Sequence, residues 1–289
     1  MPDPAARDAA EEASAFSHPA VAPDASAPYG AHPDQIVDFY APRDGRQQAP
    51  LVVALHGGAW RQPYDRQHLT PFVDFLARRG FAVANVEYRR GSGLPRQGGG
   101  APVAGRWPET FDDVAAALDA MPDLAAAHLP QADPRRIVLT GHSAGGHLAL
   151  WGAARHVLPQ GSPWRLPAAP SLRGVVALAP IAHFARAVEL DVCGGAVTQL
   201  LGGRAESAER MPYADPAALL PTGIATTVVQ GREDIVVPAE VTDAYVEAAA
   251  KAGETVGLTL LEDVGHFPLI DPAADACAVV AEEIAQLAW

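Results

Sequence analysis

Cysteine is scarce in this chain, which has only Cys193 and Cys277 among its 289 residues. Two thiols do not provide the disulfide framework of a small secreted domain, and they do not form a metal-ligand cluster. We therefore expect a protein of a reducing compartment, the cytoplasm, that uses no metal and no organic cofactor.

Long apolar runs and basic clusters are also missing. No stretch approaches the roughly 18 apolar residues of a membrane-spanning helix. The formal net charge is −13, and no basic run is interleaved with aromatic residues. These features argue against a membrane or a nucleic acid as partner. We expect a small-molecule substrate, with a second copy of the chain as the candidate protein partner.

The N-terminal segment, residues 1–34, has neither the positive region nor the apolar region of a secretion signal. Its composition, rich in Ala, Pro and Asp, predicts a mobile arm, or one that lies on the surface of the domain or of a partner subunit.

The remaining residues, 35–289, predict a single α/β domain. With 49% hydrophobic and 19% charged residues, the chain can form a sizeable core. Apolar strand-like runs alternate with helix-like segments, which predicts a mostly parallel sheet covered by helices on both faces. Residues 183–220 carry no strand pattern and predict a small helical cap insertion. The expected strands are 35–40 (an edge strand), 51–55, 81–88, 136–139, 174–179, 226–230 and 256–261, and the expected helices are 64–79, 107–127, 148–157, 239–251 and 273–287.

The segment Gly141-His142-Ser143-Ala144-Gly145 fits G-x-S-x-G between a predicted strand and a predicted helix. This pattern places a serine hydroxyl on a tight, strained turn, and side chains at the two glycines would crowd the neighbouring strand and helix. The backbone N–H of Ala144, at the start of the helix, then faces the position of an oxyanion. The motif predicts that Ser143 is a nucleophile.

A second glycine pair, Gly57 and Gly58, comes after the strand at 51–55. The sequence there, His56-Gly57-Gly58-Ala59-Trp60, resembles the HGGG-type loop that completes the oxyanion hole of lipases and esterases. We expect the two glycines to offer backbone N–H groups and His56 to brace the loop.

An acid and a base are expected at the carboxyl ends of the later strands. Asp234 comes after the strand at 226–230, with Glu233 as its rival, and His266 lies between the last strand and the last helix. By contrast, His142 and His147 are expected to be fixed in the turn and its helix, facing away from the base position.

Together these motifs resemble the α/β-hydrolases, and more narrowly the esterase and kynurenine formamidase (arylformamidase) branch with HGGxW and GHSAGGHLA. The stretch 266–271 is similar to the segment after the catalytic histidine in formamidases. The resemblance covers roughly residue 35 to the C-terminus and implies an α/β-hydrolase fold. It implies a catalytic triad of Ser143, Asp234 and His266. It also implies that the oxyanion-hole donors are the backbone N–H groups of Gly57, Gly58 and Ala144.

The resemblance points to hydrolysis of a small aryl formamide, such as N-formylkynurenine, through an acyl-enzyme. Alternatives are a carboxylesterase for short-chain or aromatic esters, acyl transfer or C–C bond hydrolysis on the same triad, and a non-catalytic binding protein of the same fold. We expect Trp60 and His183 to contact the substrate. The glycine-rich loop 90–105 leaves the end of a central strand and is a further candidate to line the site.

Overall fold

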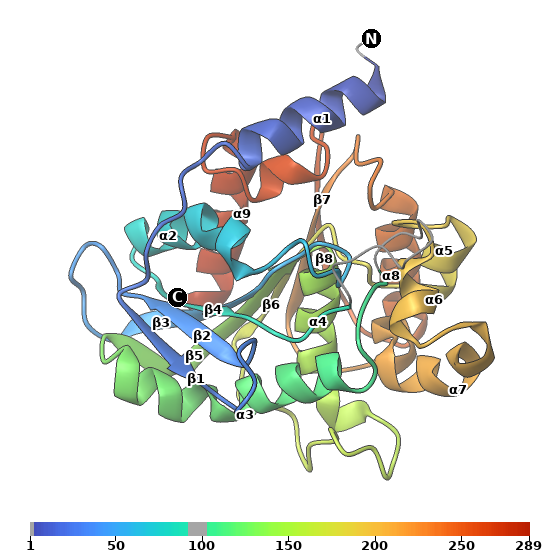
Figure 1. The fold of residues 1–289 in the computed structure, drawn as a ribbon, viewed down its shortest axis with the longest axis horizontal. Helices are drawn as coiled ribbons and strands as arrows, with labels where there is room; N and C mark the ends of the chain where they lie inside the picture. The colour runs from blue at the N-terminus through green and yellow to red at the C-terminus, as the bar shows by residue number, and fades with distance from the viewer. Residues whose placement is uncertain (1–2, 92–102) are drawn as a thin grey trace.

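A single sheet lies at the centre of the computed structural model, which describes residues 3–91 and 103–289 (Figure 1). Eight strands of this part of the chain pair in the order β1-β2-β4-β3-β5-β6-β7-β8. The pairs β1–β2 and β2–β4 are antiparallel, and the pairs among β3 to β8 are parallel. The strands are β1 (Ala25–Pro28), β2 (Ile36–Tyr40), β3 (Ala49–Leu55), β4 (Ala82–Val86), β5 (Ala132–His142), β6 (Gly174–Leu178), β7 (Thr226–Gly231) and β8 (Gly257–Leu261).

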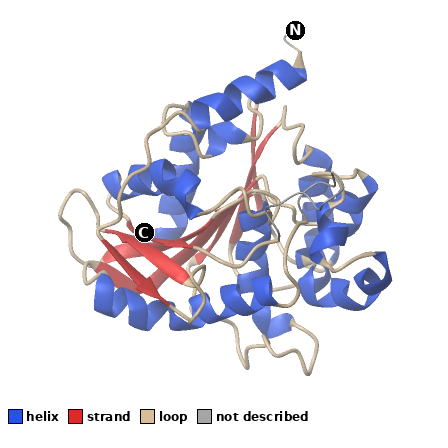
Figure 2. Cartoon of the chain, viewed as in Figure 1, coloured by secondary structure: helices blue, strands red, loops and turns tan. Residues whose placement is uncertain are grey.

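Helices cover both faces of this sheet (Figure 2). The helices α2 (Thr70–Arg78) and α9 (Asp275–Ala288) pack on one face, and α3 (Glu109–His128), α4 (Ala144–Ala153) and α8 (Ala239–Lys251) pack on the other. The architecture confirms the expected α/β-hydrolase fold, with a mostly parallel sheet between two helical layers.

The central strand β3 explains why both faces need a cover. All seven of its residues are buried. Because side chains alternate across a strand, Val52 and Ala54 join the core under α2 and α9, while Val53 and Leu55 join the core under α3, α4 and α8. The continuous apolar run thus sets the three-layer arrangement.

One expected element differs from the structure: β2 is not an edge strand, because β1 pairs along its outer side. The helix expected over 107–127 is present as α3, which continues through Pro122 to His128. Buried side chains on either side of the proline, among them Met121 and Ala125, pack the two halves of this helix on the same core; this packing offsets the backbone hydrogen bond that proline cannot donate.

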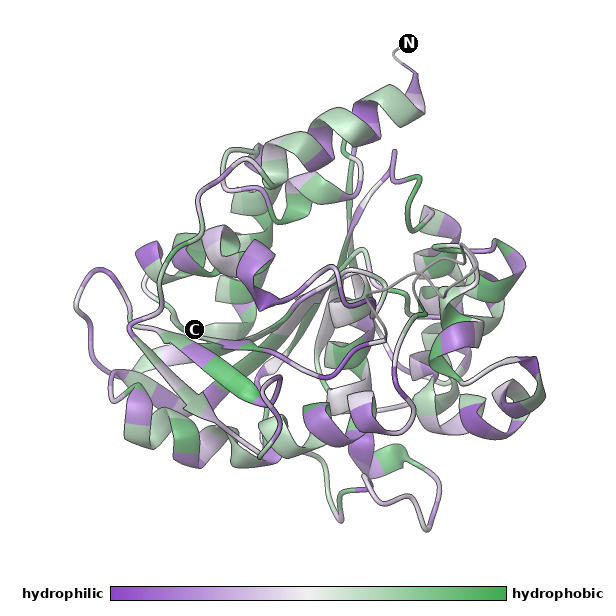
Figure 3. Cartoon of the chain, in the orientation of Figure 1, coloured by the Kyte–Doolittle hydropathy of each residue, from purple (hydrophilic) through white to green (hydrophobic). Residues whose placement is uncertain are grey.

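The N-terminal segment forms regular structure and lies on the domain surface. Asp3 caps α1 (Pro4–Ala15), since its side chain accepts the N–H of Ala5 at 3.3 Å. In Figure 1, α1 runs across the chain that leads into α9, and in Figure 3 it alternates hydrophilic and hydrophobic positions along its length. The segment thus contains a helix and a strand of the central sheet, since β1 pairs with β2.

Residues 183–220 are helical and lie beside α8 (Figure 1). Among the described helices, none is both long enough and apolar enough to cross a bilayer. The glycine-rich loop expected over 90–105 falls largely on residues 92–102, which lie outside the described residues. The helical elements of the insertion are α5 (Phe184–Glu189), α6 (Ala196–Leu200), α7 (Arg204–Ala214) and the 3₁₀ turn η3 (Pro216–Leu219).

Candidate active site

Ser143 occupies the sharp turn between β5 and α4. Its backbone is in an unusual conformation, φ 57° and ψ −117°, which non-glycine residues rarely adopt. Its N–H donates to the carbonyl of Leu178 at the end of β6, 2.8 Å away, and its carbonyl accepts the N–H of His147 at 3.1 Å. These bonds hold the strained residue at the carboxyl edge of the sheet.

Close approach of backbone explains the two glycines of the motif. A Cβ at Gly141 would lie 2.3 Å from the carbonyl oxygen of Gly145, and a Cβ at Gly145 would lie 2.0 Å from that of Leu55 on β3. Any side chain at either position would force the strand and helix apart. The crowding expected from the sequence is present at both positions.

Asp234 and His266 form a buried acid–imidazole pair. His266 Nδ1 donates to Asp234 Oδ2 at 2.6 Å. The other carboxylate oxygen accepts the N–H groups of Val236 and Val237, both at 2.8 Å, and Gln230 donates to Oδ2 at 3.2 Å. The carboxylate is therefore fixed by its own loop at the end of β7 and orients the imidazole that lies after β8. Its rival, Glu233, is instead half-exposed and pairs with Arg7.

Ser143 and His266 line the same cavity, of about 210 Å³. Gly58 and Ala59 of the loop after β3 line it as well. The structure thus brings together the nucleophile candidate, the base candidate and the glycine loop, which come from distant parts of the sequence.

His142 also lines this cavity, contrary to the expectation that it faces away. Its ring centroid is 4.3 Å from that of His266, and its Nε2 donates to the backbone carbonyl of His266 at 3.0 Å. His142 is the last residue of β5, and its side chain lies beside His266 at the carboxyl edge of the sheet. Burial, and next the charge on His266, keep the pKa of His142 well below its ordinary value, so the ring is neutral. His147 does stay away from the site, since its Nε2 donates to the carbonyl of Ala214.

The glycine loop lies directly against the serine turn. A Cβ at Gly57 would be 2.9 Å from the carbonyl oxygen of His142 and 3.4 Å from Cβ of Ser143. Gly58, Ala59 and Trp60 all have positive φ, at 99°, 51° and 55°. Consecutive residues of this kind form a tightly curved backbone whose N–H groups can converge on an anion.

His56 braces this loop from beneath, as expected. Its Nδ1 is 2.9 Å from the carbonyl oxygen of Gly57, its Nε2 is 2.8 Å from Glu87 Oε1, and its ring stacks on Tyr88 at 4.3 Å. Burial raises the pKa of Glu87, but His56 and Arg90 outweigh burial and lower it to about 2. Glu87 therefore stays ionised, and it fixes His56 from below the loop.

Neither expected substrate contact, Trp60 nor His183, is placed among the residues that line the cavity. Trp60 is fully buried and packs edge-on against His147 and Phe184, because the positive φ of Trp60 turns its side chain into the core. His183 begins α5, where its Nδ1 accepts the N–H of Arg186 at 3.2 Å. Neither residue therefore lines the cavity that contains Ser143 and His266, and their contact with substrate stays a prediction.

Aromatic side chains that the sequence did not single out form the wall of the cavity. Phe16, Tyr64, His68 and Phe267 line it together. Burial lowers the pKa of His68 to about 3, so this ring is also neutral. The one local signal was the Asp3-Pro4 helix start, which predicts a helix leading to Phe16 but not its position over the site.

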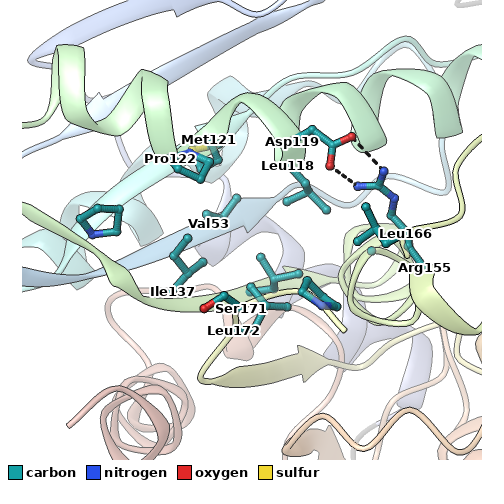
Figure 4. Close-up of a pocket in the computed structure, with 14 residues that line it drawn as sticks. Val53, Leu118, Asp119, Met121, Pro122, Ile137, Arg155, Leu166, Ser171 and Leu172 are labelled. Atoms are coloured by element: carbon teal, nitrogen blue, oxygen red, sulfur yellow. Dashed lines mark hydrogen bonds and ion pairs between the residues drawn. The ribbon is translucent and has the colours of Figure 1, made fainter. Parts of the chain in front are cut away.

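A second cavity, of about 140 Å³, lies between α3, α4 and β5, away from these residues (Figure 4). It is lined mostly by apolar side chains, with the paired Arg155 and Asp119 at one end, where the two nitrogen–oxygen distances are 2.8 and 2.9 Å. Among the described residues, no group of three or more His, Cys, Asp or Glu is arranged to hold a metal ion.

Known proteins share sequence with much of this chain. A family model described as BD-FAE matches residues 37–248. The chain is 31% identical over 121 residues to a probable isoprenylcysteine alpha-carbonyl methylesterase, ICME, of Oryza sativa subsp. japonica, covering 42% of this chain and 26% of that protein. It is 33% identical over 107 residues to the probable carboxylic ester hydrolase LipM of Mycobacterium tuberculosis (strain ATCC 25618 / H37Rv), covering 36% of this chain and 21% of that protein. The matched part thus spans about a quarter of the length of these relatives.

Solved structures share the fold over nearly the whole chain. Esterase B from Lactobacillus rhamnosis (HN001) superposes with a TM-score of 0.74 at 20% identity, covering 98% of this chain and 90% of that one. A truncated carbohydrate esterase from gut microbiota gives a TM-score of 0.73 at 18% identity, covering 93% and 99%. At such identities the likeness concerns the fold.

Proposed function

The chain belongs to the BD-FAE family, and on that premise we propose that it is a serine carboxylesterase acting on short-chain or aromatic esters. The observation that carries the proposal is the 2.6 Å bond between His266 and Asp234 beside a strained Ser143 in one cavity. Nucleophile, base and orienting acid are the three groups that acyl transfer through a serine needs.

In the proposed first step, His266 Nε2 takes the proton of the Ser143 hydroxyl while Ser143 Oγ attacks the ester carbonyl carbon. Asp234 holds the Nδ1–H tautomer and stabilises the imidazolium that forms. His266 then gives the proton to the leaving alkoxide, and the alcohol departs from the acyl-enzyme.

The oxyanion of the tetrahedral intermediate is assigned to the backbone N–H groups of Gly57, Gly58 and Ala144. Gly57 and Gly58 belong to the curved loop against the serine turn, and Ala144 is the first residue of α4, where the helix dipole favours negative charge. Each such donor contributes about 3–4 kcal/mol to transition-state stabilisation in comparable sites.

Deacylation reverses the roles of the same residues. Water enters the site of the departed alcohol, His266 removes its proton, and the resulting attack releases the acid and returns the proton to Ser143. This step needs an opening to solvent, and Phe16 at the cavity wall is 37% exposed.

The substrate class is drawn from the cavity and the relatives. A cavity of about 210 Å³ with aromatic walls suits a short acyl chain or a single aromatic ring. ICME, LipM and the two solved structures are all named as esterases or ester hydrolases, which supports an ester over the aryl formamide that the sequence motifs favour. The triad would cleave an ester and a formamide by the same steps, so turnover measurements distinguish the two substrate classes.

The test compares kcat/KM for p-nitrophenyl acetate, p-nitrophenyl butyrate and N-formylkynurenine, with Ser143→Ala as control. We expect ester turnover that Ser143→Ala abolishes, and much weaker formamide turnover. Faster cleavage of N-formylkynurenine would overturn the ester assignment. Absence of any Ser143-dependent turnover would favour a non-catalytic binding protein.

A further inference from the structure

The N-terminal helix α1 is attached to both loops that carry the proposed acid and base. Glu11 Oε1 accepts the N–H of Gly265, which precedes His266, at 3.2 Å. Arg7 pairs with Glu233, which precedes Asp234, at 3.5 Å. The segment 4–16 therefore packs against the carboxyl edge of the sheet at the active site.

The end of α1 is held by a second set of contacts to Asp271. Ser14 donates to Asp271 Oδ2 at 2.6 Å, and His18 Nε2 is 2.7 Å from Oδ1. Asp271 is nearly fully buried, whereas Ser14 is exposed and His18 is partly exposed, so the two bonds join the surface segment to a buried carboxylate. They fix the chain on both sides of Phe16.

Phe16 comes after the last turn of α1 and enters the cavity wall. Its ring lies 5.5 Å from Phe267 and 5.5 Å from His68, edge-on to both, and 6.3 Å from Tyr64. Such edge-to-face contacts define the ring's position as well as its burial. Phe16 lines the cavity and is 37% exposed, so the residue lies where the cavity meets solvent.

We propose that Phe16 is a specificity-determining residue that limits the size of the substrate group the cavity accepts. This inference rests on the proposed function, because it concerns the substrate of the same site. A smaller side chain would open the wall toward solvent, and a long acyl chain would pass where the ring now stands. The ring itself would contact short or aromatic groups.

The experiment measures kcat/KM for p-nitrophenyl acetate, butyrate and octanoate with the full chain and three variants. Phe16→Ala opens the wall and Phe16→Trp extends it. The matched control is Phe75→Ala: Phe75 lies half-buried on α2 beneath the guanidinium of Arg79 and does not line the cavity.

We expect Phe16→Ala to raise the octanoate-to-acetate ratio of kcat/KM about tenfold, the lower end of what one methylene group contributes in a hydrophobic pocket. Phe16→Trp should lower the ratio, and Phe75→Ala should leave it unchanged. The ratio does not depend on the fraction of folded enzyme, so a merely structural role of Phe16 would lower all rates together and leave the ratio constant.

A ratio within twofold of wild type in both Phe16 variants, with Ser143-dependent turnover intact, would overturn this inference alone. Loss of Ser143-dependent ester turnover in the wild type would overturn the proposed function together with it.

Discussion

Asp234 contacts its own loop through one carboxylate oxygen and the imidazole of His266 through the other. Asp234→Asn keeps the shape of the side chain but removes the charge and turns the hydrogen bond toward the wrong tautomer. We predict a fall in kcat of about 10⁴-fold, as in comparable triads. Steady-state ester hydrolysis measures it.

The neighbouring carboxylate provides a matched control for that substitution. Glu233→Gln removes only a half-exposed ion pair with Arg7, and we expect kcat within about threefold of wild type. A large fall in kcat for Glu233→Gln, with little change in kcat for Asp234→Asn, would identify Glu233 as the acid of the triad.

His142 illustrates a residue that supports the base without titrating. Burial and the nearby His266 hold the pKa of His142 well below its ordinary value, while its Nε2–H fixes the backbone of His266. We predict that His142→Gln lowers kcat/KM about tenfold and leaves the shape of its pH profile between about pH 6 and 9 unchanged, because a neutral ring adds no ionisation there. An acid limb that disappears in the variant would show that His142 itself titrates.

At the scale of elements, the crossing of α4 over β3 depends on glycine at position 145. A Cβ there would lie 2.0 Å from the carbonyl of Leu55 and 2.5 Å from that of His56. Because both obstacles are backbone, we predict that Gly145→Ala lowers the free energy of unfolding by about 2–3 kcal/mol, measured by urea denaturation.

The same helix offers the control. A Cβ at Gly152 would meet only the flexible end of Leu118, at 2.5 Å, which can rotate away. Gly152→Ala should change the free energy of unfolding by about 1 kcal/mol or less, since alanine also favours the helix. An equal loss in the free energy of unfolding for Gly145→Ala and Gly152→Ala would contradict the tight crossing at Gly145.

The elements that the sequence predicts correctly are those specified by local chemistry. The glycines around Ser143 are required by backbone contacts that the motif encodes, and α8 begins and ends as the apolar spacing and the nearby Gly253 predict. Likewise Asp234 and His266 come after predicted strands, whose parallel arrangement brings their carboxyl ends together.

The features that the sequence does not reveal depend on contacts between distant segments. Trp60 faces the core because of a run of positive φ that its residue type does not indicate. Phe16 reaches the cavity because Glu11 and Ser14 of α1 bind Gly265 and Asp271. Each of these pairs is separated by more than 250 positions in the sequence. No periodicity within residues 1–34 contains that information.

At the scale of the whole molecule, buried neutral histidines should make stability depend on pH. Burial lowers the pKa of His147 from 6.5 to about 3 in the folded protein. Since the unfolded chain binds this proton more readily, stability is present above about pH 6.5 and is lost as the pH falls toward 3. We predict that protonation of one such histidine in the unfolded chain lowers the free energy of unfolding by about 2 kcal/mol between pH 7 and pH 5.

The comparison of wild type with His147→Gln isolates this contribution, because other groups stay the same. Glu87, with its pKa lowered to about 2, loses its stabilising effect only below its ordinary value of 4.5. Asp8 and Glu11 act in the opposite sense, since burial raises the pKa of both. Parallel curves of unfolding free energy against pH in the two proteins would contradict the prediction.

The most direct test of serine catalysis in this protein is covalent labelling of the intact chain with a fluorophosphonate, read by peptide mass spectrometry. If His266 and Asp234 activate Ser143, one phosphonyl group is added, on Ser143, and the adduct is absent from Ser143→Ala and formed far more slowly by His266→Gln. A folded wild-type protein that takes up no label, or takes it up on another residue, would contradict the assignment of Ser143 as the nucleophile.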